Sequence, residues 1–359
     1  QDLLELTAGL GPGTVPGLLD RRPGELSGGQ RRRAAFARVL ASHPDVVVLD
    51  EPTSGLDADA VDQVLDAIAA LRAARPLTVL VITHDLDFAA RVADRVTRIE
   101  AGRIVETVPA GGRPVASDAP FAPVSQTRAD TAGVLDVSGL CVDTPSGATL
   151  VDGLDLTLGR GDGVALIGAS GIGKTTVVRA LVGARPPRAG TLRIAGEPTA
   201  WQLGSRAPAV RRAVQLIGQD PAGSLNPAVP VGRQLARAVH RARPQLAGAE
   251  CRREVGSLLD AVHLSAGVAS ELPKTLSGGQ AQRVAIARAL AHRPSVLLCD
   301  EATSSLDPET QRSILALLGS LRDEQGLALL IITHDDAVAR SCANRILTLH
   351  GHGRFTWSD

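Results

Sequence analysis

The chain has 359 residues, and its 38 basic and 38 acidic side chains give a formal net charge of zero, so the overall balance does not favour a nucleic acid or another strongly charged partner. Its apolar share of 44% and charged share of 21% are typical of a globular protein long enough for two domains. No apolar run approaches the ~18 residues that a membrane-spanning helix needs, so we expect any association with a membrane to be peripheral. The four cysteines have no paired spacing, which favours a reduced, cytoplasmic setting.

Residues 1–108 contain strand and helix signals of a parallel α/β fold. Val46–Leu49 is a continuous apolar run rich in β-branched residues, which predicts a buried parallel strand. Ala58–Ala74 has the spacing of an amphipathic helix, and Leu77–Ile82 and Arg95–Glu100 predict two further strands. These signals indicate part of a domain rather than isolated elements.

Residues 109–133 are rich in Pro, Gly, Ala, Ser and Thr without an apolar period, and we interpret them as an interdomain linker. Residues 134–359 predict a second, complete unit. It begins with β-rich segments, reaches a strand at Gly163–Ile167 and turns into a helix at Lys174. The alternation of strands and helices that follows is typical of a parallel sheet covered by helices.

Three short motifs occur twice with one constant separation. They are Leu26–Gln30 and Leu276–Gln280, Asp50-Glu51 and Asp300-Glu301, and Thr83-His84-Asp85 and Thr333-His334-Asp335. The differences 276 − 26, 300 − 50 and 334 − 84 are each 250. Segments in such register are copies of one folded unit. The first copy begins in what reads as the middle of a helix, so we expect the first domain to be truncated at its N-terminus.

A phosphate loop of the pattern G-x-x-x-x-G-K-[ST] occurs in the second copy alone. It consists of Gly168, Ala169, Ser170, Gly171, Ile172, Gly173, Lys174 and Thr175, and Thr176 follows it. Its glycines let backbone N–H groups converge on phosphate oxygens, its lysine adds a positive charge, and its threonine hydroxyl can bind Mg²⁺. The alternative is a glycine-rich turn without a ligand, against which the lysine and the threonine argue.

Two carboxylates, Asp300 and Glu301, end a predicted buried strand. Asp300 suits the Mg²⁺ shell, and Glu301 suits polarisation of the attacking water. Two acids that merely end a strand are a plausible interpretation when taken alone, but a weak one beside the phosphate loop. His334 follows the next strand, where a single histidine is usually a capping or packing residue, but its recurrence as His84 favours a contact with a γ-phosphate.

Ser27, Gly28, Gly29 and Gln30 place a hydroxyl and two glycines directly before a predicted helix. This arrangement is a helix start that can bind an anion. A simple helix N-cap with flanking glycines is the interpretation that the segment favours when it is considered by itself.

Together these motifs resemble the nucleotide-binding domains of ABC transporters. The resemblance includes the phosphate loop, the LSGGQ signature, the acidic strand end and the switch histidine, in the family's order, and it covers the chain outside the linker. It implies a P-loop NTPase of the α/β class, with an ABC ATPase-type parallel-sheet core, an antiparallel β subdomain and a helical subdomain, in tandem. It also implies ATP as substrate, Mg²⁺ as cofactor, and head-to-tail pairing of the two domains within the chain.

The same resemblance implies a role for each site residue. Glu301, His334 and Gln219 are the expected catalytic residues, and Thr175, Gln219 and Asp300 the expected Mg²⁺ ligands. ATP would bind the loop from Gly168 to Thr176 and, across the domain interface, the first signature, Ser27–Gln30. The family usually stacks adenine on an aromatic residue, whose place Thr144 occupies here, so we expect little discrimination between ATP and GTP.

A finer resemblance lies in Gln219–Pro227, with the sequence QDPAGSLNP. It is similar to the Q-loop of ATPases that energise importers of dipeptides, oligopeptides, nickel and glutathione, several of which fuse two ATPases in one chain. It implies transmembrane permease subunits and a solute-binding protein as partners, no direct contact with nucleic acid, and a peripheral position on the inner face of the cell membrane.

Two other functions have to be weighed against import. A soluble tandem ABC ATPase that acts on ribosomes in translation would have paired domains as well, but such proteins carry a long, strongly charged helical linker, unlike residues 109–133. A nucleotide sensor without hydrolysis is disfavoured because the glutamates and histidines of both copies are present, namely Glu51, Glu301, His84 and His334.

Overall fold

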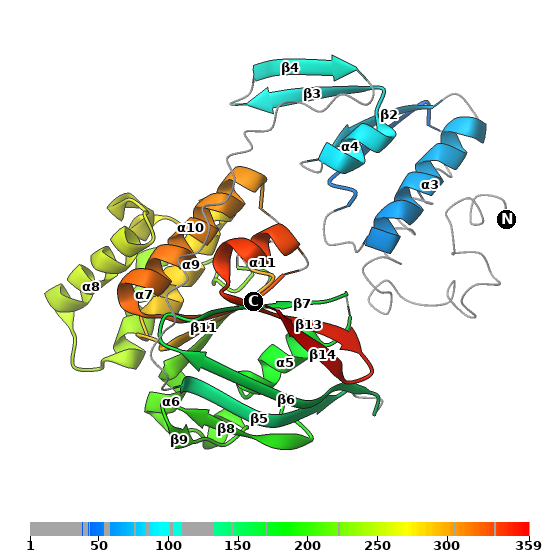
Figure 1. Ribbon diagram of the computed structural model, residues 1–359. Coiled ribbons are helices and arrows are strands. Elements are labelled where there is room, and N and C mark those ends of the chain that lie inside the picture. Colours follow the sequence, from blue (N-terminus) through cyan, green and yellow to red (C-terminus); the bar gives the residue numbers. More distant parts are fainter. Residues whose placement is uncertain are drawn as a thin grey trace. The chain divides into compact units, whose positions relative to one another are not determined.

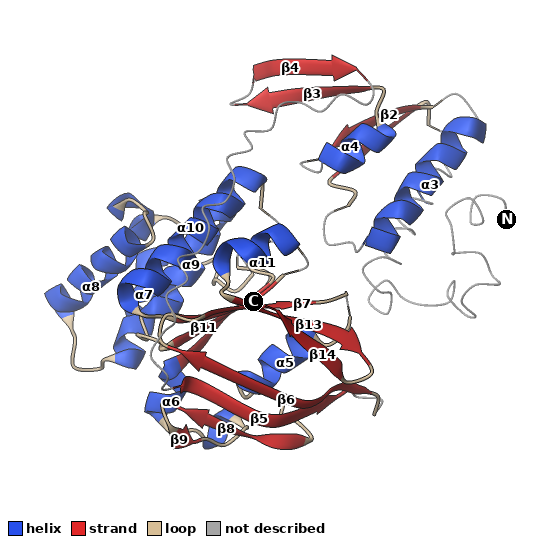
Figure 2. Cartoon of the chain, viewed as in Figure 1, coloured by secondary structure: helices blue, strands red, loops and turns tan. Residues whose placement is uncertain are grey.

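The computed structural model describes residues 38, 42, 44–53, 58–74, 77–83, 86–100, 103–109, 133–144, 147–169, 171–221, 223–303, 306–333 and 335–358. The chain divides into two compact units, residues 1–120 and 121–359. Their elements are labelled in Figure 1 and coloured by type in Figure 2. Of the expected linker, Pro109 ends a strand of the first unit and Gly133 begins a strand of the second, while residues 110–132 lie outside the described part.

A six-stranded sheet forms the centre of the second unit, with the strand order β10-β11-β12-β7-β13-β14. Its strands are β7 (Gly163–Ile167), β10 (Val214–Ile217), β11 (Val296–Asp300), β12 (Ala328–Ile332), β13 (Arg345–Gly351) and β14 (Arg354–Ser358). All neighbours are parallel except β13 and β14. β7 lies between β12 and β13 and is parallel to both. Because the phosphate loop follows β7, it lies at the carboxyl edge of the sheet, where open α/β sheets bind ligands.

One face of this sheet shares a core with the helix α5 (Lys174–Leu181) and with an antiparallel sheet of order β6-β5-β8-β9. The strands of the antiparallel sheet are β5 (Gly133–Asp143), β6 (Thr149–Gly159), β8 (Ala189–Ile194) and β9 (Glu197–Pro198). Figure 2 shows α5 between the two layers of strands. This core is apolar throughout, so it holds the start of α5 at a fixed place on the sheet.

The other face packs against helices. They are α7 (Val231–Ala242), α8 (Gly248–Ala261), α9 (Gly278–Leu290), α10 (Pro308–Gln325) and α11 (Asp336–Cys342). Shorter pieces complete the unit: η3 (Leu203–Ser205), α6 (Pro208–Ala213), η4 (Ala266–Ser270) and η5 (Pro273–Thr275). The second unit therefore has the parallel core, the antiparallel β subdomain and the helices that the sequence predicts.

Within its described residues, the first unit contains four strands and two helices. They are β1 (Val46–Asp50), α3 (Ala58–Ala74), β2 (Thr78–Ile82), α4 (Leu86–Val92), β3 (Arg95–Glu100) and β4 (Arg103–Pro109). β1 and β2 pair in parallel, and β3 and β4 form a separate antiparallel pair. The helix at residues 58–74 and the strands around it lie where the sequence predicts them.

The first unit repeats the end of the second unit element by element. β1, α3, β2, α4 and β3 begin 250 residues before β11, α10, β12, α11 and β13, respectively. The buried side chains correspond as well. Leu65, Ile68, Phe88 and Val92 are buried in the first unit, and Leu315, Leu318, Val338 and Cys342 are buried at the same register in the second.

The opposite face of β1 and β2 differs between the units. Leu80 of β2 is 54% exposed, whereas Leu330, 250 residues later in β12, is 0% exposed. In the second unit this face packs against α5 and the antiparallel sheet, and β7 joins β12 to β13. In the described part of the first unit, by contrast, β1–β2 and β3–β4 are separate sheets. Apolar side chains of β1 and β2 therefore face outward.

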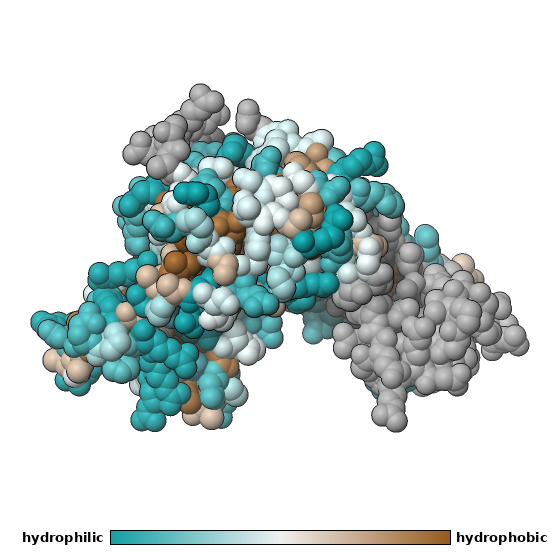
Figure 3. Space-filling model, turned by 90° about the horizontal axis from the view of Figure 1, so that it is seen from below, coloured by the Kyte–Doolittle hydropathy of each residue, from teal (hydrophilic) through white to brown (hydrophobic). Residues whose placement is uncertain are grey.

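The face of the molecule drawn in Figure 3 is mostly hydrophilic, and hydrophobic residues occur there in small, separate areas. Among the helices that the structure describes, none has both the length and the apolar character needed to cross a membrane.

Candidate functional site

The phosphate loop connects β7 to α5 through backbone angles that favour glycine. The φ angles of Gly168, Gly171 and Gly173 are 146°, 76° and 116°. At Gly168 a Cβ would lie 2.8 Å from the carbonyl oxygen of Leu349, so a larger residue does not fit. Glycines at these points fold the loop over the start of α5, where free backbone N–H groups favour an anion. Ser170 lies outside the described residues.

Lys174 is held inside this loop. Its Nζ donates hydrogen bonds to the carbonyl oxygens of Gly168 at 2.7 Å and Ala169 at 3.0 Å, and the residue is only 5% exposed. Burial lowers the pKa of the ammonium, while the negative charges of Glu301 and Asp300 raise it in part. A buried cation facing two carboxylates fits a site for a polyphosphate with a bound divalent metal.

Thr175 and Asp300 meet below the loop. The hydroxyl of Thr175, at the start of α5, donates to Oδ1 of Asp300, at the end of β11, across 3.1 Å. Burial raises the pKa of the Asp300 carboxyl, and the hydrogen bond from Thr175 opposes that shift. The structure thus brings together two of the three residues that the sequence assigns to Mg²⁺.

Gln219 and Glu301 form a second pair at the same edge of the sheet. Gln219 follows β10, and its Nε2 donates to Oε2 of Glu301 at 3.0 Å. Glu301 has φ of 48°, which is unusual for a residue other than glycine, and its N–H donates to the carbonyl of Ile332 at 3.2 Å. Glu51 of the first unit repeats this conformation with φ of 47° and a 2.8 Å bond to Ile82.

Several predicted site residues are not tested by this geometry. His334 and the first signature, Ser27–Gln30, lie outside the described residues, as does His84. Ile172 and Thr176 are half-buried on the loop and on the first turn of α5. For these residues the sequence-based assignments stay predictions.

The second signature, which begins α9, forms a helix cap. The N–H of Gln280 donates to Oγ of Ser277 at 3.2 Å, and the N–H of Ser277 donates to Oε1 of Gln280 at 2.9 Å. This reciprocal pair is a capping box. The N-cap interpretation of the serine is therefore confirmed for the second copy.

Thr144 closes a turn between β5 and β6. Its Oγ1 accepts a 2.9 Å hydrogen bond from the N–H of Ala148, and its own N–H donates to the carbonyl of Ala148 at 2.8 Å. The side chain at the expected adenine position is therefore engaged in its own loop.

The structure adds one contact that the motifs did not indicate. Arg288, in the last turn of α9, donates to the carbonyl oxygen and to Oγ of Ser224 at 2.6 and 2.9 Å. Ser224 belongs to the segment that begins with Gln219, so this segment connects Glu301 to α9. Nothing in the sequence distinguishes Arg288 from the many other arginines, and only the fold identifies it.

The donor set fits a magnesium ion held together with a nucleotide. Among the described residues, no three His, Cys, Asp or Glu side chains gather as a metal site of their own. The hydroxyl of Thr175 and the carboxylate of Asp300 meet instead beside a phosphate loop. Mg²⁺ is commonly bound in this way, by one or two protein oxygens together with phosphates and water.

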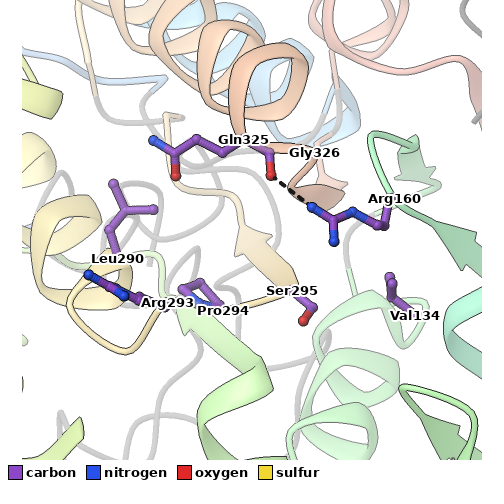
Figure 4. A pocket seen from close by; sticks show the side chains of 8 residues that line it. All are labelled: Val134, Arg160, Leu290, Arg293, Pro294, Ser295, Gln325 and Gly326. Atoms are coloured by element: carbon purple, nitrogen blue, oxygen red, sulfur yellow. Dashed lines mark hydrogen bonds between the residues drawn. The ribbon is translucent and has the colours of Figure 1, made fainter. Parts of the chain in front are cut away.

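A separate pocket of about 370 Å³ lies at the opposite edge of the sheet. Its lining includes Arg160, Arg293, Ser295 and Gly326, and Arg160 donates to the carbonyl of Gln325 at 3.5 Å (Figure 4). These residues precede β7, β11 and β12, whereas the phosphate loop follows β7. This pocket is therefore not part of the site around Lys174.

A glycine loop between a central parallel strand and a helix, with a buried lysine and a threonine–aspartate pair below it, defines a P-loop nucleoside triphosphate site. Comparison with known families narrows this class. A family model described as "ABC transporter" matches residues 9–54 and 151–304, one range in each unit.

Curated relatives cover nearly the whole chain. The peptidoglycan transport ATP-binding protein YejF of Agrobacterium fabrum is 33% identical, covering 99% of this chain and 68% of the relative. The glutathione import ATP-binding protein GsiA of Pectobacterium atrosepticum is 32% identical, covering 93% and 61%. The oligopeptide transport ATP-binding protein OppD of Mycobacterium tuberculosis is 30% identical, covering 91% and 69%. The chain thus spans 61–69% of the length of these relatives.

Solved structures agree with this result. The cbiO1 protein of Clostridium perfringens superposes with a TM-score of 0.56 at 27% identity, covering 62% of this chain and 87% of that one. The ATP-binding cassette MJ0796, as a dimer bound to ADP and Pi, gives 0.53 at 27% identity, covering 62% and 97%. The chain belongs to the ABC transporter family, and its second unit is an ABC ATPase domain.

Proposed function

We propose that the chain is the ATP-hydrolysing subunit of an importer of peptides, glutathione among them. The observation that carries this proposal is the convergence of the Thr175–Asp300 and Gln219–Glu301 pairs beside the buried ammonium of Lys174. The substrate class rests on the names of the relatives and on the similarity of Gln219–Pro227 to the Q-loop of such importers.

Each residue of the site has a proposed role. Lys174 and the N–H groups of the phosphate loop bind the phosphates of ATP. Thr175, Asp300 and Gln219 hold Mg²⁺, which would neutralise charge on the β- and γ-phosphates. Glu301 accepts a hydrogen bond from the attacking water and orients it, and His334 contacts the γ-phosphate.

Within this proposal Gln219–Pro227 couples hydrolysis to the permease. Gln219 contacts Glu301 at one end of the segment, and Ser224 is fixed to Arg288 of α9 further along. A movement of α9 relative to the sheet would therefore pull on the residue that contacts the catalytic carboxylate. A segment with this connection is well placed to sense a bound permease subunit.

We further propose that the chain contains two ABC units in tandem, which pair head to tail. The constant separation of 250 residues, the repeated elements and the two ranges matched by the family model support the duplication. In such a pair, Ser27–Gln30 of the first unit would meet the nucleotide on Lys174 of the second. Permease subunits and a solute-binding protein would be the partners, and the chain would lie peripherally on the inner face of the membrane.

Reconstitution tests the proposed function. The protein is purified with the membrane subunits encoded beside it and assayed for ATPase activity with a panel of peptides, glutathione and Ni²⁺ delivered by the solute-binding protein. We expect a peptide or glutathione to stimulate hydrolysis. Stimulation by ribosomes, with none by any solute, would contradict the proposal and favour a translation factor.

A further inference from the structure

A row of basic side chains covers the exposed face of α7. Four of the 12 residues of this helix are both basic and exposed, namely Arg233, Arg237, His240 and Arg241. Their spacing places them on one side of the helix, and we call them the basic row. The opposite side of α7 packs into the helical core, so the basic row points away from the protein. From Arg233 to Arg241 the row is about 12 Å long, at 1.5 Å per residue.

The three guanidiniums of the basic row have no carboxylate partner among the residues that the structure describes. α7 itself contains no acidic residue. Glu254 of the neighbouring α8 is paired instead with Arg243 and with Arg293. Glu271, whose carbonyl accepts from the start of α7, is engaged by Oγ1 of Thr275, which donates to its Oε2 at 3.3 Å. The row therefore presents uncompensated positive charge to the solvent.

The positive charge extends from α7 to α6. Burial lowers the pKa of His292, which follows α9, and the positive charges of Arg241 and Arg212 add to this shift. The guanidiniums of α7 and α6 thus act on the same place. Like charges repel one another in the free protein, and an anionic partner relieves that repulsion.

The basic row lacks the apolar anchors on which protein partners dock. In the described part of residues 217–303, no large hydrophobic side chain is exposed. Protein interfaces are built around buried aromatic or apolar anchors, and their centres are depleted in charge. The row also contains no Phe or Trp on which the bases of a single-stranded nucleic acid would stack. A row of guanidiniums suits a surface of phosphate groups instead.

α7 is fixed to the segment Gln219–Pro227, which is proposed to sense the permease. Nε2 of Gln234 donates to the carbonyls of Asn226 and Val229 at 3.0 and 2.7 Å, and its Oε1 accepts from the N–H of Asn226 at 3.0 Å. Arg233, the first residue of the basic row, directly precedes Gln234. The row therefore begins beside the segment that would face the membrane subunits.

We propose that the basic row of α7 binds the anionic headgroups of the membrane next to the permease. This role rests on the proposed function, which puts the chain on the inner face of the membrane, and it adds a direct contact with lipid phosphates. The contact joins exposed charges, so it weakens as the salt concentration rises.

Co-sedimentation of the full chain with vesicles tests this contact. The vesicles contain phosphatidylcholine alone or equal parts of phosphatidylcholine and phosphatidylglycerol. We expect the parent to bind the anionic vesicles and not the neutral ones. The variant combines Arg233→Gln, Arg237→Gln and Arg241→Gln, because glutamine keeps a high helix propensity. It should bind about a hundredfold more weakly, since each arginine near an anionic surface contributes about fivefold.

A matched control removes three exposed arginines from β4, α11 and β14, by Arg103→Gln, Arg340→Gln and Arg354→Gln. This control should bind the anionic vesicles as the parent does. Equal binding of the parent to both kinds of vesicle would overturn the proposal, and so would an equal loss in the control or full binding by the α7 variant. Tighter binding of the parent to polyglutamate or to RNA than to the anionic vesicles would overturn it as well.

Calorimetric titration with Mg-ATP separates this result from the proposed function. The α7 variant should bind ATP as the parent does, because the basic row is not part of the site around Lys174. A parent protein that does not bind ATP would contradict the proposed function, whatever the vesicles show. A parent protein that binds ATP but not the anionic vesicles would overturn the lipid contact alone.

Discussion

Glu301, the proposed catalytic carboxylate, has a backbone conformation that is costly for any residue other than glycine. Its φ of 48° is repeated by Glu51 at 47°, so the two units hold the same residue in the same way. Non-glycine residues in this region cost on the order of 1–3 kcal/mol and persist where surrounding contacts enforce them, often at functional sites. Here the bond from the N–H to Ile332 and the bond from Gln219 enforce it.

The Glu301→Gln variant separates binding from hydrolysis. We expect the variant to bind ATP as the parent does but to hydrolyse it several orders of magnitude more slowly, because an amide orients and polarises water poorly. Lys174→Ala should show the opposite pattern, with weakened ATP binding, since it removes a cation from the phosphate site. The measurements are ATP titration and single-turnover hydrolysis. Hydrolysis near the parent rate in Glu301→Gln would remove Glu301 from its proposed role.

Gln282 of α9 has a buried side-chain amide whose polar atoms are not hydrogen-bonded in the described part of the chain. The residue is 0% exposed, and the atoms concerned are Nε2 and Oε1. An unsatisfied buried polar group costs about 1–3 kcal/mol. We therefore expect Gln282→Met to raise the midpoint of thermal unfolding by a few degrees.

Gln234 of α7 provides the matched control for Gln282. It is also buried, but its Nε2 donates to the carbonyls of Asn226 and Val229 at 3.0 and 2.7 Å, and its Oε1 accepts from the N–H of Asn226. Gln234→Met should therefore lower the midpoint. A lower midpoint for both variants would show that Gln282 has a partner that stabilises the fold.

Among the elements, those with continuous apolar runs or a long helical period could be predicted from the sequence. β7 and α3 begin and end at the expected residues, and β1 and β2 each differ from expectation by one residue. Apolar runs mark parallel strands because both faces of such strands are buried. The short helical pieces η3, η4 and η5 have no such signal and were not predicted.

The pairs that form the site could be predicted only in part. Thr175 and Asp300 are 125 residues apart, and Gln219 and Glu301 are 82 apart, so no local pattern joins them. The motifs identified these residues, and the strand order brought them together.

Substitution of Leu80 and Leu330 tests whether the corresponding sheet faces of the two units differ in burial. The two leucines have the same place in β2 and β12 but are 54% and 0% exposed. Leu330→Ala should cost about 2–5 kcal/mol, as buried leucines do, and Leu80→Ala should cost little. The free energy of unfolding of each unit is measured by urea titration, with hydrogen exchange as the probe. An equal loss for Leu80→Ala would mean that its face of the sheet is covered in the protein.

The two units of the whole molecule contribute different motifs. The sequence of residues 1–359 contains one phosphate loop, at Gly168–Thr175, and two signatures. In a head-to-tail pair the loop would face the first signature, Ser27–Gln30. The second signature, Ser277–Gln280, would have no phosphate loop of this chain opposite it. The chain should therefore form one ATP site from both units.

Calorimetric titration of residues 1–359 with Mg-ATP, in parallel for the parent and for Ser27→Arg, tests this claim most directly. We expect one ATP bound per chain in the parent. For Ser27→Arg we expect strongly reduced hydrolysis, because a large cationic side chain would occupy the place of the γ-phosphate contact. Two equivalent ATP sites per monomeric chain, or unchanged hydrolysis in Ser27→Arg, would contradict it.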